Sequence, residues 1–361
     1  MPLGQVGGRP RPAWRPAPTT KETPSGDANT QARSGHGILL GDASRGAGGP
    51  SARPSRLGRE WPIVPERAVG IMVNLDKPGA ADTASKLFHY LIQAGADAFV
   101  DAEVAAAVGL PERALRLPDE ADRVAFVVVL GGDGTLLRAA RLLAPRGTPL
   151  LGVNFGRVGF LTELEPRELE AELPLFVAGG GQLDERAMIQ AEVTVREAAG
   201  GGTGRKRSLL ALNEFTFHKT AYARLVEVEA YVDTHHLATF SGDGLIVATP
   251  TGTTAYSLSA GGPIVDPSLS LLVLTPICPH TLYSRPVVVG PEATVGIIFR
   301  ESEGPFQECT MTVDGQEAYA IEPGTTITIQ RAPFRARLLR RPGWSFFEVL
   351  RRKLPEGGLH D

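Results

Sequence analysis

Two patterns of hydrophobic and polar positions divide the chain near residue 165. From about residue 67 to this point, runs of consecutive apolar residues alternate with segments whose apolar residues recur at helical spacing. A run of consecutive apolar residues is typical of a strand buried on both faces, as in a parallel sheet. The predicted strands are 68–75, 97–101, 125–130 and 149–153, and the predicted helices are 82–95, a short Ala-rich segment after residue 101, 136–143 and 165–179.

Beyond residue 165 the segments become short, rich in β-formers and often alternating, with regular turn signals between them. This pattern predicts an antiparallel sandwich. TTITIQRA (325–332) and FRARLLRR (334–341) read as two separate strands, and 344–354 reads as a helix that packs back on the first domain. We therefore expect an α/β + β fold, with an N-terminal α/β domain containing a parallel sheet at 66–165 and a C-terminal antiparallel β-sandwich domain at 166–343.

The first 65 residues are rich in Arg, Pro, Gly, Ser and Thr and lack apolar periodicity, so we expect a disordered tail. Nine Lys or Arg residues against four Asp or Glu residues make this tail basic. One interpretation is an arm that binds RNA or an anionic surface. The other is an inert tail or a start site placed too far upstream, and this one is favoured because aromatic residues are few.

The net charge of −3 gives no indication of nucleic-acid binding, and no apolar run reaches membrane-spanning length. Cys278 and Cys309 lack metal-site spacing, and no signal peptide is visible. His218, His235 and His236 have no carboxylate partner at metal-ligand spacing, and the same holds for His280. We therefore expect a cytoplasmic protein without a nucleic-acid partner, a membrane partner or a metal site built from side chains.

The sequence GGDGT stands between a predicted buried strand and a predicted helix. Gly131, Gly132 and Gly134 let the backbone turn and approach a ligand closely. Thr135 can cap the helix, whose free N–H groups attract phosphate oxygens. Asp133 is the loop's only ionisable side chain, so the loop suits phosphoryl transfer to a hydroxyl. A bare Gly-Asp-Gly is more often a simple turn, but the strand–loop–helix context argues against that alternative.

Four clusters in the β-rich region are more polar than ordinary strands require. Asn213 and Glu214 interrupt an apolar run and could read paired hydroxyls or an adenine edge, or could be a strand end. The segment 251–262 combines small hydroxyl residues and glycines with one ring, Tyr256, which favours a nucleoside pocket over a capped short helix. Asp243 lies in a second Gly-Asp-Gly, and VDGQ (313–316) is a hairpin signal; on spacing alone both read as turns.

Several motifs together resemble the bacterial NAD kinase family over about residues 67–352. GGDGT alone is shared with lipid kinases and 6-phosphofructokinases, whereas the long block after residue 250 with an upstream NE pair is more specific. The motifs are GGDGT (131–135), NFGRVGFLTEL (154–164), NEFTFHK (213–219), SGDGLIVATPTGTTAYSLSAGGPIVDP (241–267) and PHTLYSRPVVV (279–289).

The resemblance implies a role for each matching position. Asp133 matches the proton acceptor for the ribose 2′-hydroxyl, and Asp243 matches a carboxylate at the nicotinamide end. Ser241 stands where some members carry Arg, which leaves the use of NADH open. Arg138 could meet a phosphate or be a solvated helix residue, and Arg224 falls where members have a basic residue. The other implied dinucleotide contacts are Gly134, Asn213, Glu214, Thr254, Ala255, Tyr256, Ser257, Leu258, Ser259 and Gln316.

The reaction implied is ATP plus NAD giving ADP plus NADP, in a homodimer or homotetramer. Mg²⁺ or another divalent cation would arrive with ATP, since no dedicated metal cage is visible. ATP and polyphosphate both remain possible phosphoryl donors, and feedback by NADPH is open. Two alternatives are a lipid or sugar kinase built on the same loop and a non-catalytic NAD(P) sensor, which would bind dinucleotide without turnover.

Overall fold

The computed structural model describes residues 68–156, 159–194, 206–219, 226–280, 284–299, 309–322 and 325–354. The predicted tail at 1–65 and Arg224 lie outside these residues, as does most of GGGTGRK (200–206), whose sequence predicts a flexible hairpin tip. In the described ranges, no helix is both long enough and apolar enough to cross a bilayer.

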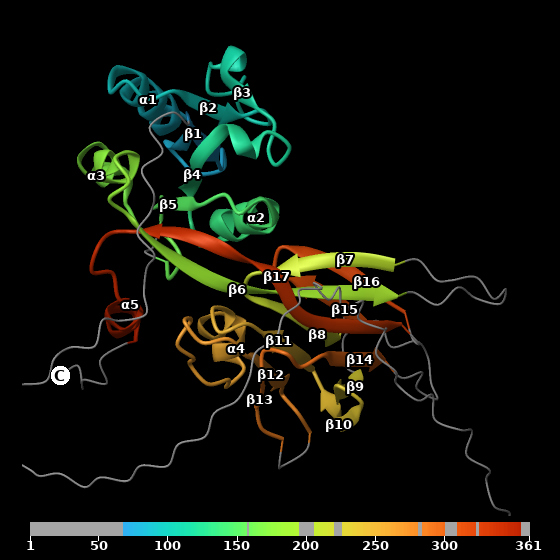
Figure 1. Cartoon of the computed structure of the whole chain (residues 1–361). Coiled ribbons are helices and arrows are strands. Elements are labelled where there is room, and N and C mark those ends of the chain that lie inside the picture. Colours follow the sequence, from blue (N-terminus) through green and yellow to red (C-terminus); the bar gives the residue numbers. More distant parts are fainter. Residues whose placement is uncertain are drawn as a thin grey trace, which may run out of the picture.

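The N-terminal part is a parallel sheet with helices packed on it (Figure 1). Its strand order is β3-β2-β1-β4-β5, and every pair is parallel. Its elements are β1 (Ala68–Val73), α1 (Ala80–Gln93), β2 (Ala98–Asp101), β3 (Ala114–Leu115), β4 (Val124–Gly131), α2 (Asp133–Leu143), β5 (Leu150–Asn154) and α3 (Leu169–Val177), with short 3-10 turns at Pro111–Arg113, Ala121–Arg123, Ala144–Arg146 and Pro166–Glu168.

The C-terminal part is built from long and short antiparallel strands. Six of them form a second sheet in the order β13-β12-β11-β8-β15-β16. The elements are β6 (Gln182–Thr194), β7 (Lys206–Ala211), β8 (Glu214–Lys219), β9 (Val226–Val232), β10 (His235–Gly242), β11 (Gly244–Ala248), η5 (Gly252–Thr254), α4 (Tyr256–Ser259), β12 (Leu272–Ile277), β13 (Val287–Val289), β14 (Val295–Phe299), β15 (Cys309–Val313), β16 (Glu317–Ile321), β17 (Thr326–Arg340) and α5 (Phe346–Lys353).

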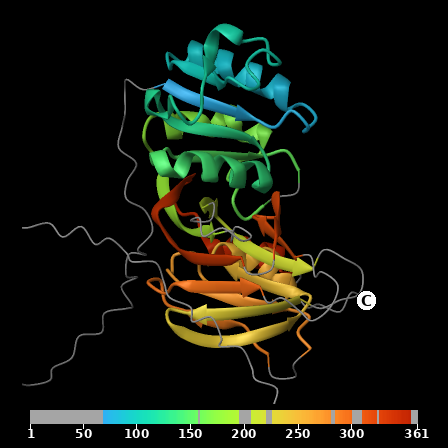
Figure 2. The same cartoon turned by 90° about the vertical axis from the view of Figure 1, so that its right-hand side faces the viewer.

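One strand, β17, joins the two parts into a continuous sheet. It pairs with β6 along its length, with β14 through residues 326–329, and in parallel with β5 at Leu338. Figure 2 shows the parallel sheet, in blue and green, above the antiparallel strands, in yellow to red. This shared strand attaches β4, β5 and α2 to the C-terminal strands of the same sheet, and the six-stranded sheet, which carries Glu214, shares an apolar cluster with those strands.

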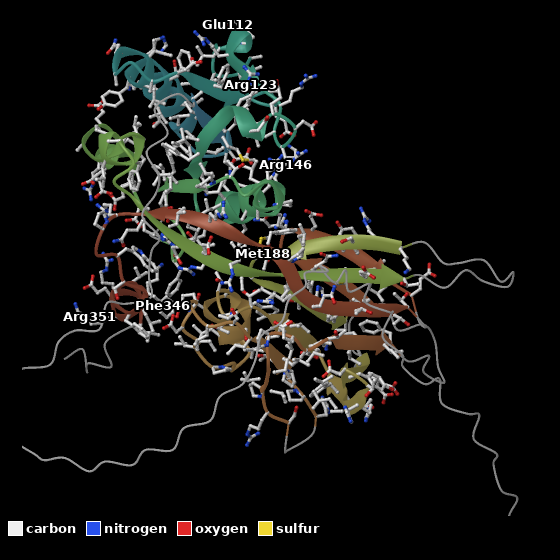
Figure 3. The ribbon with its side chains drawn as sticks, viewed as in Figure 1. Glu112, Arg123, Arg146, Met188, Phe346 and Arg351 are labelled. Carbon is white, nitrogen blue, oxygen red and sulfur yellow. The ribbon has the colours of Figure 1, made fainter. Side chains whose placement is uncertain are left out.

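Apolar side chains on both faces of the sheets form the core. The β-rich part is filled from its two sheets, for example by Phe215 and Phe217 of β8 against Ile297 and Ile327. Beneath α2 a separate cluster joins the helix to the C-terminal strands, and Met188 of β6, labelled in Figure 3, belongs to it. The α/β + β fold class is confirmed.

Two predicted elements differ from the structure. The Ala-rich segment after residue 101 is a series of turns, because its main-chain hydrogen bonds do not follow one another at helical spacing and the Asp101 side chain accepts the Glu103 N–H at 3.5 Å. The two strands predicted at 325–341 are one, β17. A register shift between Arg331 and Arg335 accommodates Pro333, which cannot donate a ladder hydrogen bond.

Candidate active site

A cavity of about 640 Å³ opens at the carboxyl ends of β1, β4 and β5. In open α/β sheets ligands bind at this edge. Asn74 follows β1, and its side chain both donates to the Thr135 hydroxyl (3.3 Å) and accepts the Asp76 N–H (3.0 Å). The cavity is lined by residues 72–77, Val104, residues 132–135, Arg138, Asn154, Gly156 and Gln316.

The glycines of GGDGT serve close packing, and none of the three has a positive φ. A β-carbon on Gly131 would lie 2.2 Å from the Thr135 hydroxyl oxygen, and one on Gly134 would lie 3.3 Å from the Gln316 amide nitrogen. The expectation that Thr135 caps the helix is wrong. Because α2 begins at Asp133, with Gly132 at its N-cap, Thr135 is already inside the first turn and its hydroxyl bonds Asn74 instead.

The Asp133 carboxylate is held by the loop that follows β5. The backbone N–H groups of Phe160 (2.7 Å), Leu161 (3.2 Å) and Thr162 (3.1 Å) donate to its oxygens, and the Thr162 hydroxyl adds a contact at 3.3 Å. Gly159 is required beside it, since a β-carbon there would lie 1.7 Å from Asp133 Oδ1. The carboxylate therefore has one defined position at the start of α2.

A buried ion-pair network supports this loop from behind. The Arg340 guanidinium, at the end of β17, donates to the carbonyl oxygens of Phe160, Leu161 and Thr162 and pairs with Glu163 (3.2 Å) and Asp184 (3.1 Å). The same three residues that donate N–H groups to Asp133 thus accept from Arg340. The loop is therefore held through its main-chain N–H groups by Asp133 and through its main-chain carbonyl groups by Arg340.

Asn213 lies between β7 and β8, and Glu214 is the first residue of β8. Glu214 is 4% exposed, and its Oε2 has no hydrogen-bond partner among the residues that the structure describes. Burial, together with the nearby Asp314 carboxylate, raises the pKa of Glu214 to about 8. Its side chain is therefore a neutral acid at pH 7, which can donate as well as accept a hydrogen bond.

The segment 251–259 packs beside this pair. A β-carbon on Gly252 would lie 2.1 Å from the Asn213 carbonyl oxygen, so only glycine fits there. Tyr256 is 45% exposed, as a stacking surface requires, whereas Ser257 is fully buried and its hydroxyl bonds Thr275 at 2.9 Å. The half-buried Thr254 hydroxyl donates to the Thr251 carbonyl oxygen at 3.1 Å.

The other predicted positions are distributed around these groups. Asp243 pairs with Lys219 at 2.6 Å, and Arg138, which lines the cavity, pairs with Glu103 at 2.7 Å. The Gln316 amide donates to the Gly134 carbonyl oxygen at 2.6 Å, so this residue reaches the GGDGT loop itself. Ala255 separates η5 from α4, where Leu258 is half-buried and Ser259 exposed.

Sequence reasoning missed several residues of the site. Asn74 and Lys77 line the cavity, and their position at the end of a predicted strand (68–75) and just after it was a usable signal. The amide donors at 160–162 carried no side-chain signal. Asp314 was read only as a turn residue, although its carboxylate accepts the N–H groups of residues 212–214.

Comparison with known proteins matches both parts of the chain to family models. The family model of the ATP-NAD kinase N-terminal domain matches residues 69–181, and that of the ATP-NAD kinase C-terminal domain matches residues 212–341. Both ranges include motifs from the sequence analysis, GGDGT in the first and the NE pair in the second.

Similar proteins and structures agree with these matches. An NAD kinase of Moorella thermoacetica is 43% identical over 290 residues, covering 80% of this chain and 90% of the relative, and one of Symbiobacterium thermophilum is 41% identical over 284 residues, covering 79% and 97%. The Archaeoglobus fulgidus NAD kinase in complex with ATP aligns with a TM-score of 0.60 at 26% identity, covering 79% of this chain and 97% of that one. Yeast NADH kinase complexed with NADH has the same fold, with a TM-score of 0.72 at 21% identity over 82% and 90% of the two chains. The chain belongs to the NAD kinase family of enzymes.

Proposed function

We propose that this enzyme transfers the γ-phosphoryl group of ATP to the 2′-hydroxyl of the adenosine ribose of NAD, giving NADP and ADP, with Asp133 as the proton acceptor. The observation that carries the proposal is one carboxylate, fixed at the N-terminus of α2 on the wall of a 640 Å³ cavity. Transfer to a hydroxyl needs a base beside the nucleophile and electrostatic stabilisation of the phosphoryl oxygens.

The cavity suits the triphosphate of the donor. Lys77 and Arg138 supply positive charge to its lining, and the first turn of α2 presents N–H groups that have no partner within the helix. Arg138 would exchange its exposed pair with Glu103 for a phosphate, at little cost because such surface pairs contribute little stability.

The dinucleotide would lie between this loop and the β-rich part. Asn213 and the neutral Glu214 would hydrogen-bond the adenosine half, and the exposed ring of Tyr256 would stack on a base. Ser257 is buried, so its place in the site is to hold the Tyr256 turn through Thr275. Lys219 would stay beside Asp243 and share contact with the nicotinamide end.

A divalent cation fits this cavity when it is carried by the triphosphate. Within the described ranges no three His, Cys, Asp or Glu side chains gather as a protein-built metal site would require. Mg²⁺ is commonly bound by one or two carboxylates together with substrate phosphates. Asp76, on the cavity wall, is the side chain that would hold it, and the ion would neutralise charge that develops on the phosphoryl oxygens.

The base role requires that one contact of the Asp133 carboxylate be released. The amide donors of 160–162 are fixed by Arg340, whereas the Thr162 hydroxyl, at 3.3 Å, leaves by a bond rotation alone. The ribose hydroxyl would then take the place of this hydroxyl on Oδ1. We infer that the Thr162 hydroxyl fills this hydrogen-bonding position on Oδ1 until the substrate binds.

The test compares Asp133→Asn and Thr162→Val with the wild type. NADP formation from NAD and ATP–Mg²⁺ is followed with an NADP-specific dehydrogenase, and NAD affinity by calorimetry. We expect Asp133→Asn to lower kcat by about 10²–10⁴ through loss of the base. Thr162→Val removes only the displaceable contact, so it should change kcat by less than about tenfold.

The calorimetric measurement of NAD affinity is needed because Asn cannot reproduce all the hydrogen bonds of this carboxylate. Both Asp133 oxygens accept N–H groups, and an amide NH₂ in place of one of them would face a donor. A variant that binds NAD like the wild type and still forms NADP at a near-normal rate would refute the base role. Sedimentation analysis would test the proposed homodimer or homotetramer.

A further inference from the structure

A single buried carboxylate fixes the segment that carries Asn213 and Glu214. Asp314 lies in the turn between β15 and β16 with a φ of 49°, and its side chain is fully buried. It accepts the N–H groups of Leu212 (3.1 Å), Asn213 (2.8 Å) and Glu214 (3.2 Å). The backbone from which the NE pair projects is thus bound to this one side chain.

The same carboxylate is paired with Arg141 of α2, the helix that begins at Asp133. Arg141 Nη1 lies 2.9 Å from Asp314 Oδ2, and the arginine side chain is 11% exposed. Arg141 Nη2 donates to Gln316 Oε1 at 3.0 Å, and the Gln316 amide nitrogen donates to the Gly134 carbonyl oxygen at 2.6 Å. The contacts close a ring through the GGDGT loop, α2 and the Asp314 turn, and the NE segment is attached to this ring by its N–H groups on Asp314.

We propose that Arg141 and Asp314 are positioning residues that hold the GGDGT loop and the NE segment at the separation that a bound dinucleotide requires. This inference rests on the proposed function, because it assigns both segments to one substrate. Neither residue needs to touch the substrate or the reacting atoms. Small displacements of groups that bind one ligand reduce productive binding steeply, so the pair should act on substrate affinity as well as on turnover.

Apolar contacts already attach α2 to the C-terminal strands without this pair. Leu136, Leu137 and Ala140 of the helix share a buried cluster with Met188 and Leu212. A charged pair is therefore not what keeps the helix attached. Replacing both partners of a buried ion pair by apolar residues is often neutral for stability, so the role that we assign to this pair is placement of the two segments.

The experiment is a double-mutant cycle of Arg141→Gln, Asp314→Asn and the double variant, read as KM for NAD and kcat. In Asp314→Asn the remaining oxygen can still accept from Asn213 and Glu214, which both donate to Oδ1. We expect each single variant to raise the KM for NAD by about tenfold or more and the double variant to be no worse than the poorer single one, since both changes break the same Arg141–Asp314 pair.

Arg337→Gln is the matched control. This arginine also links the two parts of the chain, through the Gly147 carbonyl oxygen (3.1 Å) and Glu185 (3.3 Å), but lies outside the ring. It should lower the melting temperature at an unchanged KM. Arg141→Lys keeps the charge but cannot reach Asp314, Gln316 and Glu317 together, as Arg141 does, so it should give an intermediate KM. This variant decides the matter if Asp314→Asn does not fold.

Two results would overturn the inference. One is an unchanged KM in the folded single variants, with loss of activity only in proportion to the folded fraction. The other is additive effects in the double variant. Failure of the proposed function would look different, because the wild-type enzyme itself would then form no NADP.

Discussion

Gly159→Ala is the substitution that most directly tests how Asp133 is held. The new β-carbon would lie 1.7 Å from Asp133 Oδ1 and 2.0 Å from its Cγ, whereas ordinary contacts are 3.4 Å or longer. Loop and carboxylate must therefore separate by roughly a further 1.5–2 Å. The clash cannot be relieved locally, because the amide donors at 160–162 belong to the same loop.

This separation sets the size of the effect. Hydrogen bonds of 2.7–3.2 Å between Asp133 and these amides would be stretched past the distance at which they hold. A misplacement of about 1 Å at a reacting group costs on the order of 10²-fold in rate. We expect kcat to fall by about 10² or more, which corresponds to a barrier increase of roughly 3 kcal/mol.

The assay is the initial rate of NADP formation over a range of NAD and ATP concentrations. Gly156→Ala in the same loop is the control, because its β-carbon would have Asn154 Oδ1 as nearest neighbour at 4.0 Å, and it should keep kcat within about tenfold. A Gly159→Ala enzyme with near-normal kcat would show that turnover does not need the carboxylate where the amides hold it.

Two further predictions concern buried charge. Burial raises the pKa of Glu214 to about 8 from an ordinary 4.5, so the folded protein holds this proton more tightly than the unfolded chain does. The contribution of this group to stability is fully present below pH 4.5 and is lost as the pH rises through 8, by an amount on the order of several kcal/mol. Urea unfolding at pH 6 and pH 9 should show this decline in the wild type and a smaller one in Glu214→Gln; equal declines would contradict it. Arg340→Met leaves Glu163 and Asp184 with fewer partners inside the protein, so it should cost about 3–5 kcal/mol of unfolding free energy. Arg331→Gln, which breaks an exposed pair with Glu292, should cost less than about 1 kcal/mol in the same urea titration, and equal costs would show that the Arg340 network is not desolvated.

Local patterns were sufficient where one element carries the signal. Consecutive apolar residues predicted β1, β4 and β5, and helical spacing predicted α1, α3 and α5 within a few residues. The Asp-Gly of VDGQ predicted a hairpin, and Asp314 and Gly315 both have positive φ there. Motifs in a fixed order were also sufficient to identify the family, because they do not depend on how the elements pack.

The pattern failed where a contact from elsewhere in the chain decided the conformation. Thr135 has the chemistry of a cap, but the helix starts two residues earlier and Asn74 takes its hydroxyl. Pro333 reads as a strand end, yet pairing with β6 continues past it through a bulge. In both cases a tertiary partner contributes a hydrogen bond that no local pattern records.

The sequence by itself determined most of the elements, the carboxylate of Asp133 in its glycine-rich bend, and membership of the NAD kinase family. Only the tertiary structure decided that residues 160–162 hold this carboxylate, that Arg340 holds those residues, and that Asp314 joins α2 to the NE segment. The physical reason is that these contacts use main-chain N–H and carbonyl groups or buried charges from distant segments. Every residue carries the same main-chain groups, so their partners are fixed only when the strands pair and the sheet brings the segments together.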